Sequence, residues 1–328
     1  MITGIGGFVA SHLAEFLIDN TDWDIYGTLR IIEPVDNLNK LILRINTGDR
    51  VHVLYADLND SRSISEAFKT VRPDYVFHMA SQSFPGTSFV SAEDTLHTNI
   101  IGTLHILEAI KEYVPDAMVH VCSSSEVYGM VTEEELPITE SCRLSPASPY
   151  SISKVGTDML GKLYADAYKL NIMITRMFTH TGARRSDYFA ESTFAKQIAM
   201  AEIGKVDIIM VGNLNSKRTV ADVRDAVRAY YMLLTINPVP GEIYNIGGTH
   251  VCTVGDILDT LMELSGTRYP VVEDKDRIRP LDADLQVPDC SKFMNHTGWK
   301  PVYKFKNTMQ DLLDYWRARV RNGEYLIR

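Results

Sequence analysis

Apolar and polar residues alternate in blocks along the first half of the chain. Short runs rich in apolar and β-branched residues, typical of strands, lie at residues 24–29, 51–55, 75–79, 118–122 and 172–177. Stretches with helical spacing separate them, at residues 11–19, 61–69, near 92–113 and from about 149 to 170. This alternation predicts an α/β fold built on a doubly wound parallel sheet. Its ligand is expected beyond the carboxyl ends of the strands, where the strand order reverses.

After about residue 180 the alternation is looser. We expect a charged loop at residues 183–188, helices around 192–202, 254–264 and 307–321, and short strands near 208–211 and 243–245. This pattern predicts a smaller C-terminal lobe, with residues 1–178 forming the first domain, some later segments returning to it, and 179–328 mainly forming the second. Met1-Ile2-Thr3 looks like the end of a first strand, so either the start is trimmed or another start codon lies upstream.

Composition narrows the function classes. The 328 residues are 45% hydrophobic and 23% charged, as in a folded globular protein, and the net charge of −9 argues against a nucleic-acid or membrane-surface partner. Four cysteines without C-x-x-C spacing signal neither a disulfide framework nor a metal site, which fits a reducing cytoplasm. No apolar run approaches the roughly 20 residues that a membrane span needs.

A glycine-rich turn connects the first short strand to the first helix. Gly4, Gly6 and Gly7, followed by Phe8, form G-x-x-G-x-x-A at this junction. Such glycines let the backbone approach a pyrophosphate, which then rests on the N–H groups of the helix N-terminus. The turn therefore predicts a dinucleotide site, with a purely structural turn as the alternative.

The end of the second strand bears on the choice of cofactor. A basic residue there suits the 2′-phosphate of NADP, whereas a carboxylate suits the ribose diol of NAD. Arg30 favours NADP, with NAD as the alternative if Arg30 is a surface charge and Glu33 turns inward. Asp57 and Leu58 fit an adenine contact, but Asp57 is equally well explained as a cap of the next helix.

Tyr150 and Lys154 lie one helical turn apart, so the ammonium can lower the pKa of the phenol and let it accept a hydroxyl proton. Pairs with this spacing also arise by chance, so the residues near them in the fold decide whether this pair is catalytic. Ser124 and Glu126 follow the strand at 118–122 and offer a hydroxyl and a carboxylate at the same edge of the sheet. The alternative for the serine–glutamate run is a helix N-cap with its capping-box acid.

With the glycine turn, Ser124 and Tyr150-x-x-x-Lys154 in this order, the chain resembles the extended short-chain dehydrogenase/reductase family over nearly its whole length. Within it, the sequence is most similar to the GDP-mannose 4,6-dehydratases and the related GDP-4-keto-6-deoxymannose reductases. The supporting stretches are Ser81-Gln82-Ser83, Gly102-Thr103-Leu104, Gly212-Asn213-Leu214, Arg279-Pro280 and Thr297-Gly298-Trp299-Lys300-Pro301. The resemblance implies a Rossmann domain that binds NADP and a C-terminal lobe that binds a nucleotide-sugar.

The resemblance also implies roles for single residues. Ala80 and Ser81 would contact the cofactor, whereas the substrate would contact Gln82, Ser83, Thr179, Lys196, Arg218 and Arg279. The two arginines match a pyrophosphate clamp, with surface salt bridges as the alternative. Arg184 and Arg185 match a loop that touches cofactor or a neighbouring subunit.

Two departures from the family pattern matter. Ser125 stands where the dTDP-glucose dehydratases have the acidic Asp, and Ser124-Ser125-Glu126 instead matches the Thr-Ser-Glu of the GDP-mannose enzymes. Thr179 replaces the usual Asn, which puts its diphosphate contact in doubt.

The sequence therefore favours a GDP-sugar 4,6-dehydratase with NADP as an internal hydride shuttle, in which Tyr150, Lys154, Ser124 and Glu126 are catalytic. A reductase or epimerase on the same scaffold, and a non-catalytic nucleotide-sensing protein, are the alternatives. Partly apolar helices near 92–113 and 149–170 suggest a homodimer or homotetramer.

Overall fold

A seven-stranded, wholly parallel sheet forms the centre of the computed structural model, which describes residues 1–325. Its strands are β1 (Ile2–Thr3), β2 (Ile25–Leu29), β3 (Val51–Tyr55), β4 (Tyr75–His78), β5 (Met118–Cys122), β6 (Asn171–Met177) and β11 (Ile243–Ile246). They lie in the order β11-β6-β5-β4-β1-β2-β3, so the order reverses between β1 and β4. This sheet confirms the predicted doubly wound Rossmann fold.

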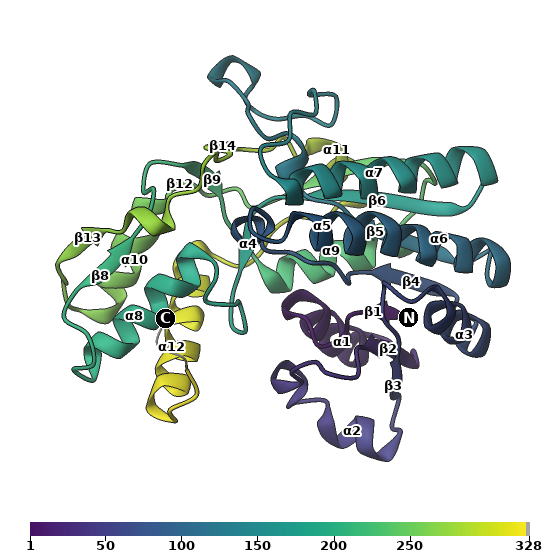
Figure 1. The fold of residues 1–328 in the computed structure, drawn as a ribbon, viewed down its shortest axis with the longest axis horizontal. Helices are drawn as coiled ribbons and strands as arrows, with labels where there is room; N and C mark the ends of the chain where they lie inside the picture. The colour runs from purple at the N-terminus through teal and green to yellow at the C-terminus, as the bar shows by residue number, and fades with distance from the viewer. Residues whose placement is uncertain (326–328) are drawn as a thin grey trace.

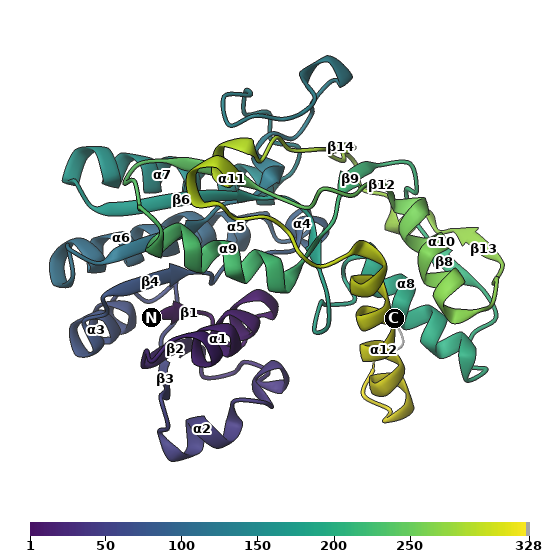
Figure 2. The same ribbon diagram turned by 180° about the vertical axis from the view of Figure 1, so that it is seen from behind.

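Helices cover both faces of the sheet (Figures 1 and 2). On one face, α1 (Phe8–Asn20) packs against α9 (Val223–Thr235), and their apolar side chains form one core that also includes Phe293 and Trp299. On the other face, α3 (Ser61–Val71), α6 (Gly102–Tyr113) and α7 (Pro149–Tyr168) enclose a second core around Phe68 and Ile106. Two buried faces explain why the central strands are mostly apolar.

The helix predicted near residues 92–113 is divided. It consists of α5 (Ala92–Leu96), a π-helical turn (His97–Ile101) and α6. Within the turn, the carbonyl oxygen of Asn99 accepts hydrogen bonds from the hydroxyls of Thr103 and Thr157. Side-chain donors of this kind interrupt the regular backbone ladder of an α-helix, and apolar spacing does not reveal them.

The C-terminal lobe is a smaller α/β unit beside the sheet (Figure 2). Its helices are α8 (Ala190–Glu202), α10 (Val254–Ser265) and α12 (Phe305–Arg321), which share a core of their own. Short strands complete it, as the sheet β12-β9-β14 (Val251–Thr253, Lys217–Thr219, Leu285–Gln286) and the pairs β13-β8 (Val271–Glu273, Ile209–Val211) and β10-β7 (Ala221–Asp222, His180–Thr181). Because α9, β11 and α11 (Ser291–Thr297) belong with the large sheet, a boundary at residue 178 stays a prediction.

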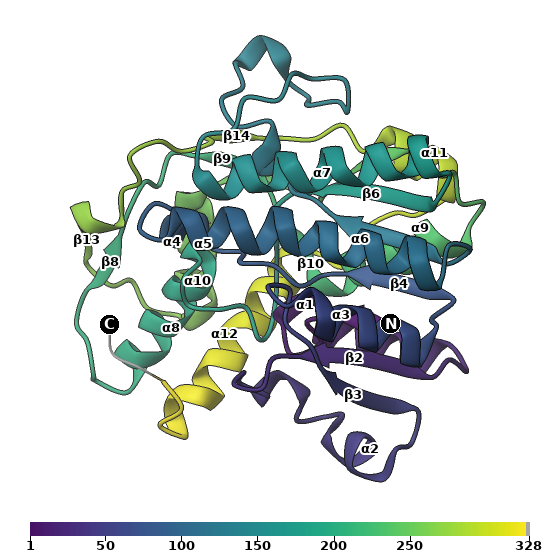
Figure 3. The ribbon, with the colours of Figure 1, turned by 45° about the vertical axis from the view of Figure 1, so that its right-hand side comes forward.

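Between β5 and α7 the chain leaves the body of the molecule as a projecting segment, residues 130–145 (Figure 3). The segment starts at Gly129, whose φ of +54° lies in the left-handed region. A Cβ there would stand 1.8 Å from the carbonyl oxygen of Ser145, so only glycine fits. The segment closes on itself at this point, because Met130 N–H donates to the same oxygen and Ser145 N–H donates to Val127.

The remaining short helices are α2 (Ile42–Thr47) and α4 (Pro85–Ser88). Within residues 1–325, no helix combines the length and the apolar character that crossing a membrane requires.

Candidate active site

The glycine turn has the geometry of a diphosphate cradle. Gly4 has a φ of +68°, and a Cβ on it would lie 3.0 Å from the Cα of Ala80, at the end of β4. Gly7 is the N-cap of α1 and provides no side-chain cap, so the first N–H groups of this 13-residue helix are left for a ligand. The residues present therefore fit a dinucleotide. Phe8, the first residue of α1, borders the cradle.

At the end of β2, the two candidate cofactor residues form an ion pair but differ in exposure. The Arg30 side chain is 63% exposed, whereas the Glu33 side chain is 19% exposed. The Glu33 carboxylate accepts the backbone N–H of Arg30, and one of its oxygens lies 3.6 Å from the position of a Cβ on Gly6. Glu33 thus turns inward toward the glycine turn. The Arg30 guanidinium lies 3.8 Å from the Glu33 carboxylate, and most of the Arg30 side chain remains exposed to solvent.

The other expected cofactor residues border the same edge of the sheet. Asp57 Oδ1 accepts the N–H of Asn59 in a tight turn, and the cap of α3 is Asp60 instead. Leu58 is buried against Gly102. Ala80 and Ser81 follow β4, and the N–H of Ala80 donates to the hydroxyl of Thr3 in β1, which keeps this loop beside the glycine turn.

Tyr150 and Ser124 meet at the carboxyl end of β5. Ser148 caps α7 and Pro149 begins it, which places Tyr150 in the first turn. The phenol lies near the Ser124 hydroxyl, and both residues are buried. Burial raises the pKa of Tyr150, whereas the Ser124 hydroxyl and the charge of Arg185 lower it.

Lys154 lies one turn further along α7, and its ammonium is 6.0 Å from the centroid of the Tyr150 ring. The ammonium donates to the carbonyl oxygen of Cys122 at the end of β5, at 2.9 Å. Burial lowers the pKa of Lys154. The arrangement allows Lys154 to support the ionisation of a phenol beside it.

Glu126 is the acid–base candidate of the site. It lies in a 3₁₀ turn, Ser125–Val127, whose N-cap is Ser124, and the Ser124 hydroxyl accepts the N–H of Glu126. Ser124 is therefore both a cap and a partner of Tyr150, and the two roles coexist. Burial raises the pKa of Glu126, and the charges of Arg279 and Arg218 act in the opposite direction.

The two candidate clamp arginines come from the C-terminal lobe. Arg218 lies on β9, and its Nε is buried without a hydrogen-bond partner among residues 1–325. Arg279 donates to Asp282 at 3.1 Å and remains 30% exposed. Both charges act on the Glu126 carboxyl, so the two guanidinium groups lie near it. Two guanidinium groups in this position can bind a diphosphate beside Glu126.

The remaining expected substrate residues are placed less directly. The Gln82 side chain accepts the N–H of Phe84 within its own loop, and Ser83 is exposed beside it. Thr179, between β6 and β7, is half-buried. The Lys196 ammonium is buried and forms an ion pair with Asp187 at 2.8 Å, so it is engaged within its own lobe.

Arg185 stands out in the structure, although the sequence assigned it no role of its own. Its guanidinium lies 3.4 Å from the centroid of the Phe189 ring, 5.4 Å from that of Phe8 and 3.3 Å from the Glu191 carboxylate. A buried cation thus joins the C-terminal lobe to the glycine turn, close enough to affect Tyr150. The sequence shows two adjacent arginines, but which residues they contact depends on how the loop folds.

Arg184, its neighbour, is oriented toward α1. Its guanidinium donates to Glu15 at 2.5 Å and to the Ser11 hydroxyl at 3.2 Å. This arginine therefore ties the loop to the helix that begins at the glycine turn.

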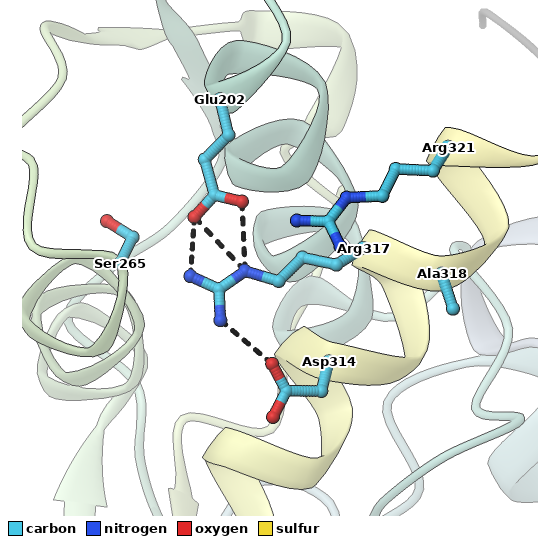
Figure 4. Close-up of a pocket in the computed structure, with 6 residues that line it drawn as sticks. All are labelled: Glu202, Ser265, Asp314, Arg317, Ala318 and Arg321. Atoms are coloured by element: carbon cyan, nitrogen blue, oxygen red, sulfur yellow. Dashed lines mark hydrogen bonds and ion pairs between the residues drawn. The ribbon is translucent and has the colours of Figure 1, made fainter.

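A cavity of about 480 Å³ lies elsewhere, between α8, α10 and α12 (Figure 4). Its charged side chains are largely committed to one another, because Arg317 donates to both Glu202 and Asp314. Nothing in it resembles the side chains gathered at β5 and α7. Within residues 1–325, no group of three or more His, Cys, Asp and Glu side chains could hold a metal ion.

Parallel strands with a glycine turn after β1, and Ser, Tyr and Lys at the end of β5, define an extended short-chain dehydrogenase/reductase. The model of the family described as GDP-mannose 4,6 dehydratase matches residues 1–312, and the chain belongs to this family.

Similar proteins carry different activities. A GDP-6-deoxy-D-mannose reductase of Pseudomonas aeruginosa is 28% identical over 98% of this chain and 97% of its own length. A dTDP-glucose 4,6-dehydratase of Haemophilus influenzae is 30% identical over 96% of this chain and 97% of its own length. The solved structure of RMD from Pseudomonas aeruginosa complexed with NADPH has a TM-score of 0.81 and 25% identity, and covers 97% of this chain and 98% of that one. The chain is thus an enzyme of the nucleotide-sugar dehydratase, reductase and epimerase group, and overall identity does not select the reaction.

Proposed function

We propose that this protein is a GDP-sugar 4,6-dehydratase that converts GDP-mannose, or a related GDP-sugar, to a GDP-4-keto-6-deoxy sugar. The observation that carries the proposal is the position of Glu126, a half-buried residue whose carboxyl has a raised pKa, in the same site as Tyr150. Water elimination needs such a group, whereas reduction of a ketone does not. The Ser-Ser-Glu run that contains Glu126 supports the GDP-mannose branch.

The residues of the site divide the reaction between them. A nicotinamide dinucleotide held by Gly4, Gly6 and Gly7 would supply hydride chemistry at C4 and C6. Tyr150, with Lys154 and Ser124, accepts the O4 proton as C4 becomes a ketone. The ketone acidifies C5, and Glu126 removes the C5 proton. The same carboxyl group then donates a proton to the C6 hydroxyl, which leaves as water.

The raised pKa of Glu126 suits this double role. A group that first takes and then returns a proton works best when its pKa is near the working pH. Burial raises the pKa of the Glu126 carboxyl, and the charges of Arg279 and Arg218 lower it in opposition. The same two arginines are placed to bind the diphosphate.

For the cofactor we propose NADP, with the exposed Arg30 side chain reaching the 2′-phosphate. The inward position of Glu33 is the observation that supports NAD as the alternative. We also infer that the protein forms a homodimer or homotetramer through α7, whose outer face carries the exposed apolar side chains Ile152, Met159 and Leu163.

A reductase of GDP-4-keto-6-deoxy sugars is the second candidate, favoured by the 28% identical relative of that activity. An epimerase and a non-catalytic nucleotide sensor are further alternatives. A panel of GDP-, UDP-, CDP- and dTDP-sugars with NADP, but without added NADPH, distinguishes a dehydratase and an epimerase from the other two, and NADPH oxidation with a GDP-4-keto-6-deoxy sugar then distinguishes a reductase from a sensor. A dehydratase converts one of these sugars to a 4-keto-6-deoxy product, an epimerase inverts it, and a reductase or a sensor leaves all of them unchanged.

The decisive variant is Glu126→Gln, which keeps the size of the side chain but removes its basic oxygen. We expect C4 oxidation to survive while water elimination falls by roughly 10²–10⁴-fold, the usual contribution of a positioned acid or base. Product analysis and solvent deuterium at C5 measure the two steps. Glu108→Gln, at an exposed position of α6, is the matched control. If Glu126→Gln eliminates water at near the parent rate, Glu126 is not the acid–base group and has only a structural role in the turn that Ser124 caps.

A further inference from the structure

The Glu126 turn is followed by a buried tyrosine that takes part in a polar network. The hydroxyl of Tyr128 donates to Asn245 Oδ1 at 2.7 Å and accepts from the Arg176 guanidinium at 3.0 Å. Arg176 in turn forms a two-pronged ion pair with Asp158, at 2.8 and 3.0 Å. We call Tyr128, Asp158, Arg176 and Asn245 the Arg176 network. All four residues are at most 4% exposed.

This network reaches the catalytic helix. Asp158 lies on α7, one turn after Lys154 and two turns after Tyr150, and therefore on the same side of the helix. Arg176 projects from β6, and its guanidinium lies 5.1 Å from the centroid of the Tyr128 ring. One guanidinium thus contacts both the helix that carries the proposed base for O4 and the turn that carries Glu126.

The network also holds the projecting segment 130–145, which connects Glu126 to Tyr150 along the chain. Arg176 donates to the carbonyl oxygen of Glu140, and Asn245 donates to that of Ile138. The Glu140 carboxylate in turn accepts a hydrogen bond from the backbone N–H of Asn245. Ile138 itself is paired with residues 287–289, directly after β14. The inner part of the segment is therefore fixed from several sides.

The carboxyl of Glu126 has no comparable support. Within residues 1–325 it accepts no hydrogen bond, and only the backbone N–H of Glu126 is bonded, to Ser124. Its position relative to Tyr150 therefore depends on the backbone of the turn, and the first side chain beyond the turn is Tyr128, its C-terminal cap. A misplacement of about 1 Å in a catalytic group can cost roughly 10²-fold in rate.

Stability alone does not account for such a network. Apolar residues of similar volume often replace a buried ion pair at little or no cost in free energy. What an apolar replacement cannot provide is a fixed distance between three separate backbone segments. We propose that Tyr128 and Arg176 are positioning residues that hold the Glu126 turn at its working distance from Tyr150. The inference rests on the proposed function, because it assigns Glu126 a step that needs this distance.

The test compares Tyr128→Phe, which loses only the hydroxyl, with Tyr164→Phe. Tyr164 is also buried on α7, but its hydroxyl donates to Glu108, away from the network. Two partial reactions are followed. Hydride transfer at C4 reports Tyr150 and Lys154, whereas exchange of the C5 hydrogen of a GDP-4-keto-6-deoxy sugar with deuterated solvent reports Glu126.

We expect Tyr128→Phe to slow C5 exchange by about tenfold or more. C4 transfer and the Kd for NADP should change less than about twofold, and Tyr164→Phe should alter none of the three. Arg176→Lys, which keeps the charge but cannot reach Asp158 and Tyr128 together, should show the same selective loss if Tyr128→Phe fails to fold. An equal loss of both partial reactions, or no loss of either, overturns the proposal.

A readout without catalysis keeps the two proposals apart. Amide hydrogen exchange by mass spectrometry should show residues 125–130 and 137–146 exchanging faster in Tyr128→Phe than in the parent protein, with no change there in Tyr164→Phe. If the parent protein neither eliminates water nor exchanges the C5 hydrogen, the proposed function fails. Amide hydrogen exchange alone then tests whether the Arg176 network holds the Glu126 turn in place. Unchanged exchange at residues 125–130 in Tyr128→Phe overturns the positioning role.

Discussion

Burial shifts the three central titratable side chains toward their neutral forms. It raises the pKa of Tyr150 and of Glu126 and lowers that of Lys154. Charge separation in the site therefore depends on fixed cations, and arginines from the C-terminal lobe provide them, Arg185 beside Tyr150 and Arg279 with Arg218 beside Glu126.

Cofactor choice is decided by single residues at the end of β2. If Arg30 binds the 2′-phosphate, Arg30→Ala should weaken NADP by about 1.5–3 kcal/mol and leave NAD nearly unchanged, because only NADP carries the charge-assisted contact. Glu33→Ala should mainly weaken NAD, since the inward carboxylate can bind the ribose diol. Titration calorimetry with both cofactors measures each effect. Equal weakening of NADP and NAD by Arg30→Ala would contradict the assignment.

At the scale of elements, local chemistry explains what the sequence predicts well. Most predicted strand ends agree with the structure to within one residue, as for β3 and β5, because each strand is bounded by polar or turn-forming residues. The grouping of Ser124, Glu126 and Tyr150 also follows from their places after β5 and in α7. The double arginine was assigned to a loop that touches cofactor or a neighbouring subunit, but the contacts of Arg185 and the Arg176 network were not predicted, because they depend on the tertiary folding of distant segments.

The elements that the sequence analysis missed include several short strands, several short helices and one long helix. The strands β9, β12 and β14 have only two or three residues, too few for a period-2 pattern to stand out. Helix α9 is long and amphipathic, yet it follows directly on two short strands in the looser half of the chain. Its aspartates also serve tertiary contacts, since Asp225 accepts the N–H groups of Val302 and Tyr303.

A side chain at Gly129, between the Glu126 turn and the projecting segment, should strongly destabilise the fold. Gly129→Ala should destabilise the fold by more than Gly204→Ala, because both positions have positive φ but only at Gly129 does the new Cβ collide with backbone, 1.8 Å from Ser145 O. The positive φ alone costs roughly 1 kcal/mol, and the collision adds to it. Urea unfolding of both variants gives the comparison. If both variants lose the same free energy of unfolding, the segment 130–145 adjusts to the new side chain and does not constrain the Glu126 turn.

At the scale of the whole molecule, the two lobes contribute complementary chemistry. The sheet domain supplies the glycine turn, Ser124, Glu126, Tyr150 and Lys154, and the C-terminal lobe supplies Arg185, Arg218 and Arg279. Their contact is aromatic as well as ionic, since Phe84 after β4 lies 5.0 Å from Tyr188 and 5.7 Å from Phe189, between ring centroids. Glu126, shortly after a strand of the first lobe, is half-buried, and the arginines whose charges act on it come from the second.

The outer face of α7 sets the expectation for assembly. Ile152, Met159 and Leu163 are 49%, 58% and 54% exposed, and their spacing of seven and four residues places them on one side of the helix. An apolar stripe on a long exposed helix is a typical self-association surface, and a two-fold axis across it would pair α7 with α7 of a second copy. Leu163→Glu should therefore shift the protein toward monomers, as measured by sedimentation velocity over a range of protein concentrations. Leu43→Glu is the matched control, because Leu43 is 72% exposed on α2, away from this face.

Since Tyr150 and Lys154 lie on the same helix with buried side chains, the monomeric variant should also bind the nucleotide-sugar less tightly if pairing stiffens α7. A Leu163→Glu protein that sediments like the parent would place the subunit contact on another surface.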